Sequence, residues 1–165
     1  RWSFNPYEWY GPASSAVGMY QITDGTFDAA KRLCIHDHVV VEEGPWYDFK
    51  SCWFNGLYTR TVPSHAIEMT AAWLDRNVRV VTERRRRTRA TLNQKQNLAA
   101  IIHLCGIGGG DAFARRRFRL PRGERCGSHD VRAYLRRVNA MKREFAELAA
   151  ARPSGPAPHA AEKGS

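Results

Sequence analysis

Apolar residues recur along much of this chain at the three- and four-residue spacing of an amphipathic helix, and clusters of glycine or proline separate the stretches. The periodicity predicts helices over 24–33, 64–78, 88–105 and 131–148, with a further short helix over 111–117. The stripe of apolar residues in the last helix is the strongest. The fold class that follows is mainly α, with helices joined by long loops and minimal sheet.

Residues that favour helix ends mark the expected boundaries. Thr23, Ser64 and Ser128 each stand just before a periodic stretch, where a hydroxyl can cap the first turn. The glycines between 106 and 110 are expected to break the third long helix. The valines at 39–41 form the one short stretch that we expect to be extended.

The length of 165 residues fits one domain that can bury a core without a stabilising metal. No apolar run approaches the roughly 18 residues that cross a bilayer, so no membrane span is expected. Proline, glycine, alanine and serine dominate the C-terminal end. We therefore predict a domain over 1–151 and a disordered tail over 152–165. The first residue is Arg1 rather than Met, which suggests a processed form or a piece of a longer chain.

The chain is strongly basic, with 26 Lys and Arg against 16 Asp and Glu and a formal net charge of +10. The excess is concentrated in the second half, in clusters at 84–89, 115–125 and 132–143. This balance favours a polyanionic partner, which can be a nucleic acid, an anionic membrane face or an acidic wall polymer. A merely solvated surface is the alternative. Neither an aromatic-rich sheet signature nor zinc-finger spacing supports a nucleic-acid module.

The chain has four cysteines and no C-x-x-C pair: Cys34, Cys52, Cys105 and Cys126. Three connectivities are possible, and we expect sequential pairing because each bridge then closes a loop of modest length. Two disulfides indicate an oxidising compartment, such as a periplasm or the outside of a cell. The competing interpretation is a zinc site of Cys34, His36, His38 and Cys52, which the long gap before Cys52 disfavours. No metal or cofactor is therefore expected.

The stretch Gly18-Met19-Tyr20-Gln21 follows a turn of small residues and precedes a threonine-containing helix start. It resembles the Gly-Leu-Met-Gln signature of the lysozyme-like lytic transglycosylases. The resemblance makes these four residues substrate-binding candidates. Gly18 lets the backbone approach a sugar, and Met19 and Tyr20 divide between core and cleft. The amide of Gln21 offers a donor and an acceptor to sugar hydroxyls or an N-acetyl group.

Two further stretches are similar to segments of the same family. Phe4-Asn5-Pro6-Tyr7 looks like the segment that follows the catalytic Glu. The run from His103 to Ala112 looks like the His-Leu-Gly and Gly-Gly-Ala loop of tail-associated members. The resemblance covers roughly 1–27 and 95–120. It implies a lysozyme-like fold of the α+β superfamily, and it adds His103 and Gly109 to the substrate-binding candidates.

In this family one Glu acts as acid and then as base, while a hydroxyl of the muramic acid attacks the anomeric carbon. Alignment on the Phe-Asn-Pro segment places that Glu at about Arg1, which cannot donate a proton at neutral pH. We expect the Glu just upstream, on a first helix that this chain lacks; loss of the Glu, or its replacement by another carboxylate, are the alternatives. The candidate replacement is Glu8, between Tyr7 and Trp9, although an exposed loop acid is the favoured interpretation.

Each candidate also has a purely structural interpretation. Met19 and Tyr20 can be core residues, and His103 can be a satisfied structural histidine. The glycines at 106–110 can form a helix C-cap and turn. Three family-like motifs in the expected order nevertheless favour a glycan site over these separate explanations.

We therefore expect a lytic transglycosylase or muramidase that acts on peptidoglycan glycan strands in the periplasm or outside the cell. Such domains commonly belong to secretion-system or phage-tail assemblies. A catalytically inactive glycan-binding module of the same fold is the first alternative. A basic nucleic-acid-binding protein is the second, and disulfide bonding would count against it.

Overall fold

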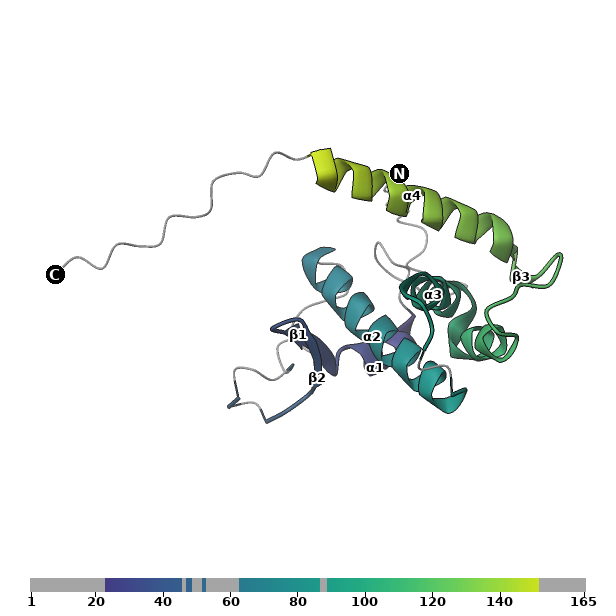
Figure 1. Cartoon of the computed structure of the whole chain (residues 1–165). Coiled ribbons are helices and arrows are strands. Elements are labelled where there is room, and N and C mark those ends of the chain that lie inside the picture. The colour runs from purple at the N-terminus through teal and green to yellow at the C-terminus, as the bar shows by residue number, and fades with distance from the viewer. Residues whose placement is uncertain (1–22, 46, 49–51, 53–62, 87–88, 152–165) are drawn as a thin grey trace, which may run out of the picture. The chain divides into compact units, whose positions relative to one another are not determined.

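The computed structural model describes residues 23–45, 47–48, 52, 63–86 and 89–151. These residues form a mainly α chain with little sheet, as the sequence predicts (Figure 1). The chain divides into two compact units, Arg1–Arg119 and Leu120–Ser165, which are described separately below. The single domain over 1–151 stays a prediction, and the predicted tail lies outside the described residues.

The described part of the first unit contains three helices and one hairpin. They follow in the order α1 (Asp24–Ala30), β1 (Leu33–His36), β2 (Val39–Glu42), α2 (Pro63–Arg84) and α3 (Leu92–Arg115). Each helix that the periodicity predicts here is present, although α2 runs six residues past the predicted end at 78. Val81 and Thr82 are buried in that extension, so packing carries the helix beyond its regular apolar stripe.

The hairpin β1–β2 was only partly predicted. Its strands pair antiparallel, with Leu33 opposite Glu42 and His36 opposite Val39. Asp37 and His38 form the turn with φ values of 49° and 64°, and a type I′ turn requires left-handed backbone at both positions. The predicted helix ran to residue 33, whereas α1 ends at Ala30 and is followed by β1. The hairpin as such was not predicted because its turn lacks the Asn-Gly or Gly-Gly pair that marks most such hairpins.

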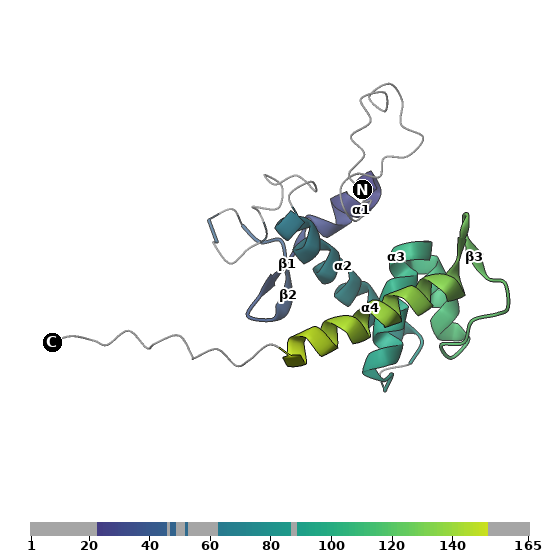
Figure 2. The ribbon, with the colours of Figure 1, turned by 90° about the horizontal axis from the view of Figure 1, so that it is seen from above.

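Helices α2 and α3 pack against each other and supply most of the core. Met69 and Val81 of α2 and Leu98, Ile101 and Ile102 of α3 are at most 2% exposed. Burying a large apolar side chain contributes about 1.5–3 kcal/mol. The hairpin lies on the other side of α2 from α3, as the two views in Figures 1 and 2 agree. The first unit is therefore organised around α2.

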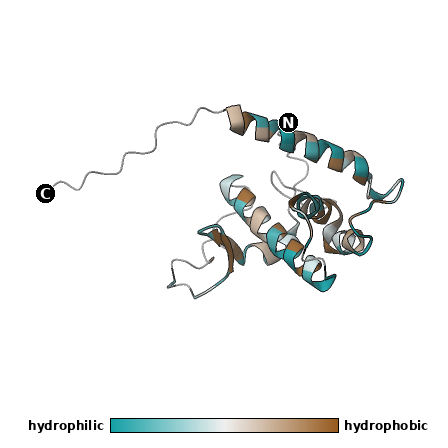
Figure 3. Cartoon of the chain, viewed as in Figure 1, coloured by the Kyte–Doolittle hydropathy of each residue, from teal (hydrophilic) through white to brown (hydrophobic). Residues whose placement is uncertain are grey.

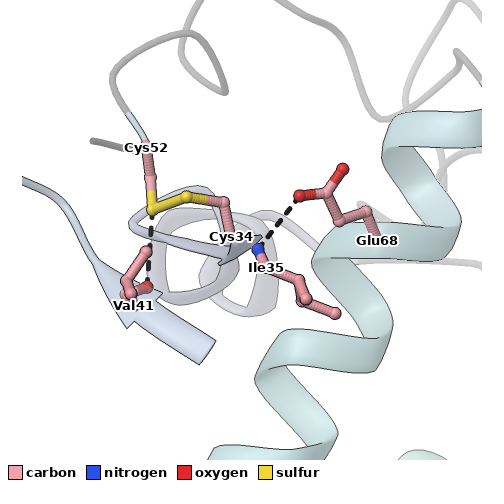
Figure 4. The surroundings of a disulfide bond; sticks show 5 residues. All are labelled: Cys34, Ile35, Val41, Cys52 and Glu68. Atoms are coloured by element: carbon pink, nitrogen blue, oxygen red, sulfur yellow. Dashed lines mark hydrogen bonds between the residues drawn. A yellow bond between two sulfur atoms is a disulfide. The ribbon is translucent and has the colours of Figure 1, made fainter. Parts of the chain in front are cut away.

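A disulfide and a carboxylate hold the hairpin to other parts of the same chain, Cys52 and α2 (Figure 4). Cys34 of β1 is bonded to Cys52, which confirms the first predicted pair. On the edge of β1 that does not pair with β2, the backbone N–H of Ile35 donates a hydrogen bond of 3.0 Å to Glu68 Oε1 of α2. Cys52 Sγ also lies 3.4 Å from the carbonyl oxygen of Val41. This is a packing contact, because a disulfide sulfur carries no hydrogen to donate.

The zinc interpretation of this region is wrong, since both of its cysteines are consumed by the disulfide. Within the described residues, no group of three or more His, Cys, Asp or Glu side chains is arranged to hold a metal ion. Cys105 and Cys126 are disulfide-bonded as well, so none of the four cysteines is a free thiol.

The described part of the second unit contains β3 (Arg125–Cys126), β4 (His129–Asp130) and α4 (Val131–Ala151). The predicted cap of α4 is wrong. Ser128 lies in the tight turn between β3 and β4, and the carboxylate of Asp130 caps the helix by accepting a 2.6 Å hydrogen bond from the N–H of Ala133. The cap expected at Ser64 is also wrong, because α2 already begins at Pro63, a residue suited to the first helical position. Thr23 stands at the predicted N-cap position of α1, but its side chain makes no capping hydrogen bond.

The apolar stripe of α4 is only half buried. Val131 and Leu135 at its start are covered. Met141, Phe145 and Leu148 are 49%, 69% and 61% exposed. Hydrophobic and hydrophilic residues alternate along this helix (Figure 3), and the apolar side chains of its second half are exposed. Periodicity located the helix correctly, but it does not report whether the apolar face finds a neighbour.

Candidate functional site

Most of the predicted site lies outside the described residues. This holds for the catalytic candidate, the expected Glu position and the four residues of the first motif: Glu8, Arg1, Gly18, Met19, Tyr20 and Gln21. Their roles stay predictions. The structure does describe His103 and Gly109, and both belong to α3.

Helix α3 starts from a complete capping box. The Thr91 hydroxyl accepts a 3.2 Å hydrogen bond from the N–H of Gln94, and the Gln94 side chain accepts one of 2.9 Å from the N–H of Thr91. Two of the otherwise unpaired groups at the helix start are thereby satisfied. The segment that carries His103 is consequently anchored at its beginning.

The same helix bends at Gly106, whose φ of 71° and ψ of 177° are not helical. Glycine reaches this conformation at little cost, because it has no Cβ. The chain is helical again from Ile107 to Arg115. The turn interpretation is therefore right for Gly106 and wrong for the glycines at 108–110, which are helical. The short helix predicted over 111–117 is the second segment of α3.

Two of these helical glycines are needed for close packing at the bend. A Cβ added to Gly109 would lie 2.4 Å from the Cβ of Cys105. One added to Gly110 would lie 2.3 Å from Cγ1 of Ile102. Neither distance is possible between carbon atoms unless the neighbouring side chain or the backbone moves. Gly109 therefore has a packing role, and its predicted contact with substrate stays a prediction.

His103 lies three residues before the bend. Desolvation by the surrounding chain lowers the pKa of His103 below its ordinary value, even though the residue keeps a large exposed surface. The imidazole is therefore neutral at neutral pH, with one nitrogen able to donate and the other able to accept a hydrogen bond. That chemistry suits a sugar hydroxyl or an acetamido group, and the role of His103 in binding stays a prediction.

A salt bridge that the sequence analysis missed joins the ends of α2 and α3. Arg85 Nε donates a 2.8 Å hydrogen bond to Asp111 Oδ1, and a second guanidinium nitrogen contacts Oδ2. The two side chains are 33% and 18% exposed. The sequence contains one indication that Asp111 pairs with an arginine, because Asp111 is the only acid between Arg84 and Gly123.

The arginines around Asp111 set its protonation state. The hydrogen bond from Arg85 lowers the pKa of Asp111 below its usual range, and the charges of Arg85, Arg84 and Arg115 lower it further against an opposing desolvation effect. Asp111 is therefore ionised throughout the neutral and mildly acidic range. Arginines at the ends of both α2 and α3 thus stabilise the ionised form of Asp111.

We expect the contribution of Asp111 to stability to depend on pH. Because its pKa is lower in the folded chain than in the unfolded chain, the stabilisation is present above about pH 4 and is lost as the pH falls through the folded-state value. The gap in unfolding free energy between the wild type and Asp111→Asn should shrink on acidification, as measured by urea unfolding. Asp75→Asn, which removes an exposed 2.9 Å pair with Arg79, should have a smaller effect at neutral pH. A gap that widens on acidification would contradict this assignment.

Compared with protein families, curated proteins and solved structures, the chain matches none. Among the described residues, α3 alone is long and apolar enough by composition to cross a membrane. A core helix passes the same test, and Leu98, Ile101 and Ile102 give α3 a buried face against α2. The functional assignment therefore rests on the residues of this chain.

Proposed function

We propose that this chain is a lysozyme-like domain of the lytic transglycosylase type, which cleaves the bond between N-acetylmuramic acid and N-acetylglucosamine in peptidoglycan. The observation that carries the proposal is the order of three family-like motifs, at 4–7, 18–21 and 103–112. Helices α1 and α2 lie between the second and third motifs. One such motif is a weak signal, whereas three motifs in the family's order favour this family over an unrelated fold.

The third motif coincides with the bend in α3, which lends it support. Three of the five residues from 106 to 110 are glycines with conformational or packing demands: Gly106, Gly109 and Gly110. A plain core helix does not need such a bend. Here the bend ends the helical segment that carries His103, whose neutral imidazole can bond to a sugar.

The proposed cleavage needs one carboxylic acid. It protonates the glycosidic oxygen as the bond to the anomeric carbon breaks, and the resulting carboxylate then takes the proton of the muramyl 6-hydroxyl. The 6-oxygen bonds to the anomeric carbon and gives a 1,6-anhydro end. The family's Glu aligns at about Arg1, which cannot donate the proton, so the acid is a Glu just upstream of Arg1 or else Glu8. A module that binds glycan without cleaving it is the alternative if neither carboxylate acts.

Charge and cysteine chemistry support the wall as the place of action. The disulfide between Cys34 and Cys52, with Cys105 and Cys126 also bonded, fits a periplasmic or secreted protein. A formal charge of +10 suits a polymer that bears muramyl and peptide carboxylates. Membership of a secretion-system or phage-tail assembly belongs to the same proposal.

Gln21→Ala tests the motif assignment. Loss of the amide should weaken binding to purified peptidoglycan sacculi, or turnover of them, by about tenfold, the effect of one good hydrogen bond of about 1.4 kcal/mol. The thermal unfolding midpoint should stay unchanged. Gln96→Ala is the matched control, because Gln96 is an exposed glutamine on α3 outside all three motifs. Equal activity of the two variants would remove Gln21 from the site.

A further inference from the structure

The C-terminal ends of α2 and α3 bring together arginines from two separate runs of the sequence. We call them the arginine cluster: Arg84, Arg86, Arg115, Arg116, Arg117 and Arg119. Hydrogen bonding between Arg85 and Asp111 ties the two helix ends, and the charges of Arg84 and Arg115 both reach the same carboxylate. Arg84 and Arg115, about thirty positions apart in the sequence, therefore lie near the same carboxylate.

Acidic residues are scarce in the sequence around these arginines. Asp111 is the only acid between Arg84 and Gly123, and it is already paired with Arg85. Glu83 is the nearest acid before the cluster in sequence. Arg84, Arg86, Arg115, Arg117 and Arg119 are exposed. The C-terminal end of α2 has the colour of hydrophilic residues in Figure 3. Like charges gathered within roughly one Debye length, about 8 Å, repel each other unless an anion lies among them.

The backbone holds two members of the cluster and the neighbouring Phe118 in an uncommon conformation. Arg86, Arg117 and Phe118 have φ values of 52°, 56° and 60°, in the left-handed region. This conformation costs about 1–2 kcal/mol for a residue with a Cβ. The Phe118 ring packs edge-on against Phe113, with centroids 5.6 Å apart, and thereby fixes the turn that presents Arg117 and Arg119. Strain of this kind is concentrated at functional surfaces.

We propose that the arginine cluster, whose residues lie outside the three predicted glycan motifs in the sequence, is a secondary binding surface for the carboxylates of peptidoglycan and holds the strand during cleavage. The inference rests on the function proposed above. A guanidinium group forms paired hydrogen bonds with a carboxylate, and several exposed guanidinium groups match a polymer with repeated carboxylates. The disulfides favour a wall polymer over a nucleic acid as the anion.

The test compares two triple variants that remove the same charge. The first replaces three exposed cluster residues, as Arg84→Gln, Arg86→Gln and Arg115→Gln. The second replaces three exposed arginines of α4, as Arg136→Gln, Arg137→Gln and Arg143→Gln. Binding is measured by co-sedimentation with purified sacculi at physiological salt, and folding by the thermal unfolding midpoint. We expect the cluster variant to lose about tenfold in affinity and the α4 variant to lose no more than about threefold.

Modified sacculi identify the anion. Amidation of the peptide carboxylates should weaken wild-type binding and abolish the difference between the two variants. Binding that survives amidation and disappears after removal of wall phosphates would overturn the proposal, because phosphate would then be the ligand.

The two variants and a nucleic-acid control decide the remaining outcomes. Equal losses in the two variants would overturn the proposal in favour of net charge alone. Selective loss of binding to a DNA oligonucleotide, with binding to sacculi unchanged, would replace it with a nucleic-acid surface. Failure of the wild type itself to bind sacculi would refute the proposed function, whereas normal binding by the cluster variant would refute this inference alone.

Discussion

Replacing both Cys34 and Cys52 with alanine should lower the free energy of unfolding by about 3 kcal/mol. The bond joins residues 18 positions apart. Cross-linking that loop reduces the conformational entropy of the unfolded chain, so removing the bond restores freedom to the unfolded state. Both cysteines are also at most 5% exposed, so their loss leaves small cavities in the folded state.

Urea unfolding of the double variant against the wild type measures this effect. The hairpin should then be the first region to exchange its amide hydrogens, because it loses its covalent link to Cys52 and keeps only noncovalent contacts with α2, among them the Glu68 hydrogen bond and the 2.6 Å pair between Arg76 and Glu42. Removing that surface pair with Arg76→Gln is the control, with an expected loss of no more than about 1 kcal/mol. A double variant as stable as the wild type would show that the disulfide does not support the fold.

Opposite effects are expected from alanine at two neighbouring glycines of α3. Gly110→Ala should lower the free energy of unfolding by about 1–3 kcal/mol, since the new Cβ would lie 2.3 Å from Ile102 Cγ1 and 3.3 Å from Leu98 Cδ1. Gly108→Ala should raise it by about 0.5–1 kcal/mol. Nothing lies within 4 Å of a Cβ there, and alanine is the better helix former. The pair is matched, because the same methyl group is added two residues apart.

Thermal and urea unfolding of the two variants test the packing at the bend. If both substitutions stabilise the chain, the close approach of the two segments of α3 is wrong. If both destabilise it, glycine is needed throughout the motif for a reason other than packing, and direct contact with a ligand becomes the leading explanation. The second outcome would be accompanied by weaker binding to sacculi for Gly108→Ala as well.

The helices were predictable because their signal is local. Apolar spacing alone located α2, α3 and α4, since a helix must present one face to a core wherever it lies in the chain. Helix ends were less predictable. Ser128 and Asp130 are both good capping residues two positions apart, and the turn between β3 and β4 uses the first and leaves the second to cap α4.

A hairpin with an uncommon turn and a salt bridge between distant residues both escaped prediction. The pairing of β1 with β2 requires left-handed backbone at Asp37 and His38, and neither residue type is restricted to that conformation. The bond between Arg85 and Asp111 joins residues 26 positions apart, a separation at which no periodicity applies. Of the predicted site residues, the structure describes His103 and Gly109 in α3, and their roles in binding stay predictions. Nothing in the sequence indicated that the bend would be confined to Gly106.

Digestion of purified sacculi by the protein extended upstream of Arg1, where the catalytic Glu is expected, is the most direct test of the proposed function. The soluble products are identified by mass spectrometry, and binding is followed by co-sedimentation. We expect the protein to co-sediment with sacculi and to release muropeptides that end in 1,6-anhydro-N-acetylmuramic acid. Binding without release would limit the chain to glycan recognition. Absence of both binding and release would contradict the proposed function.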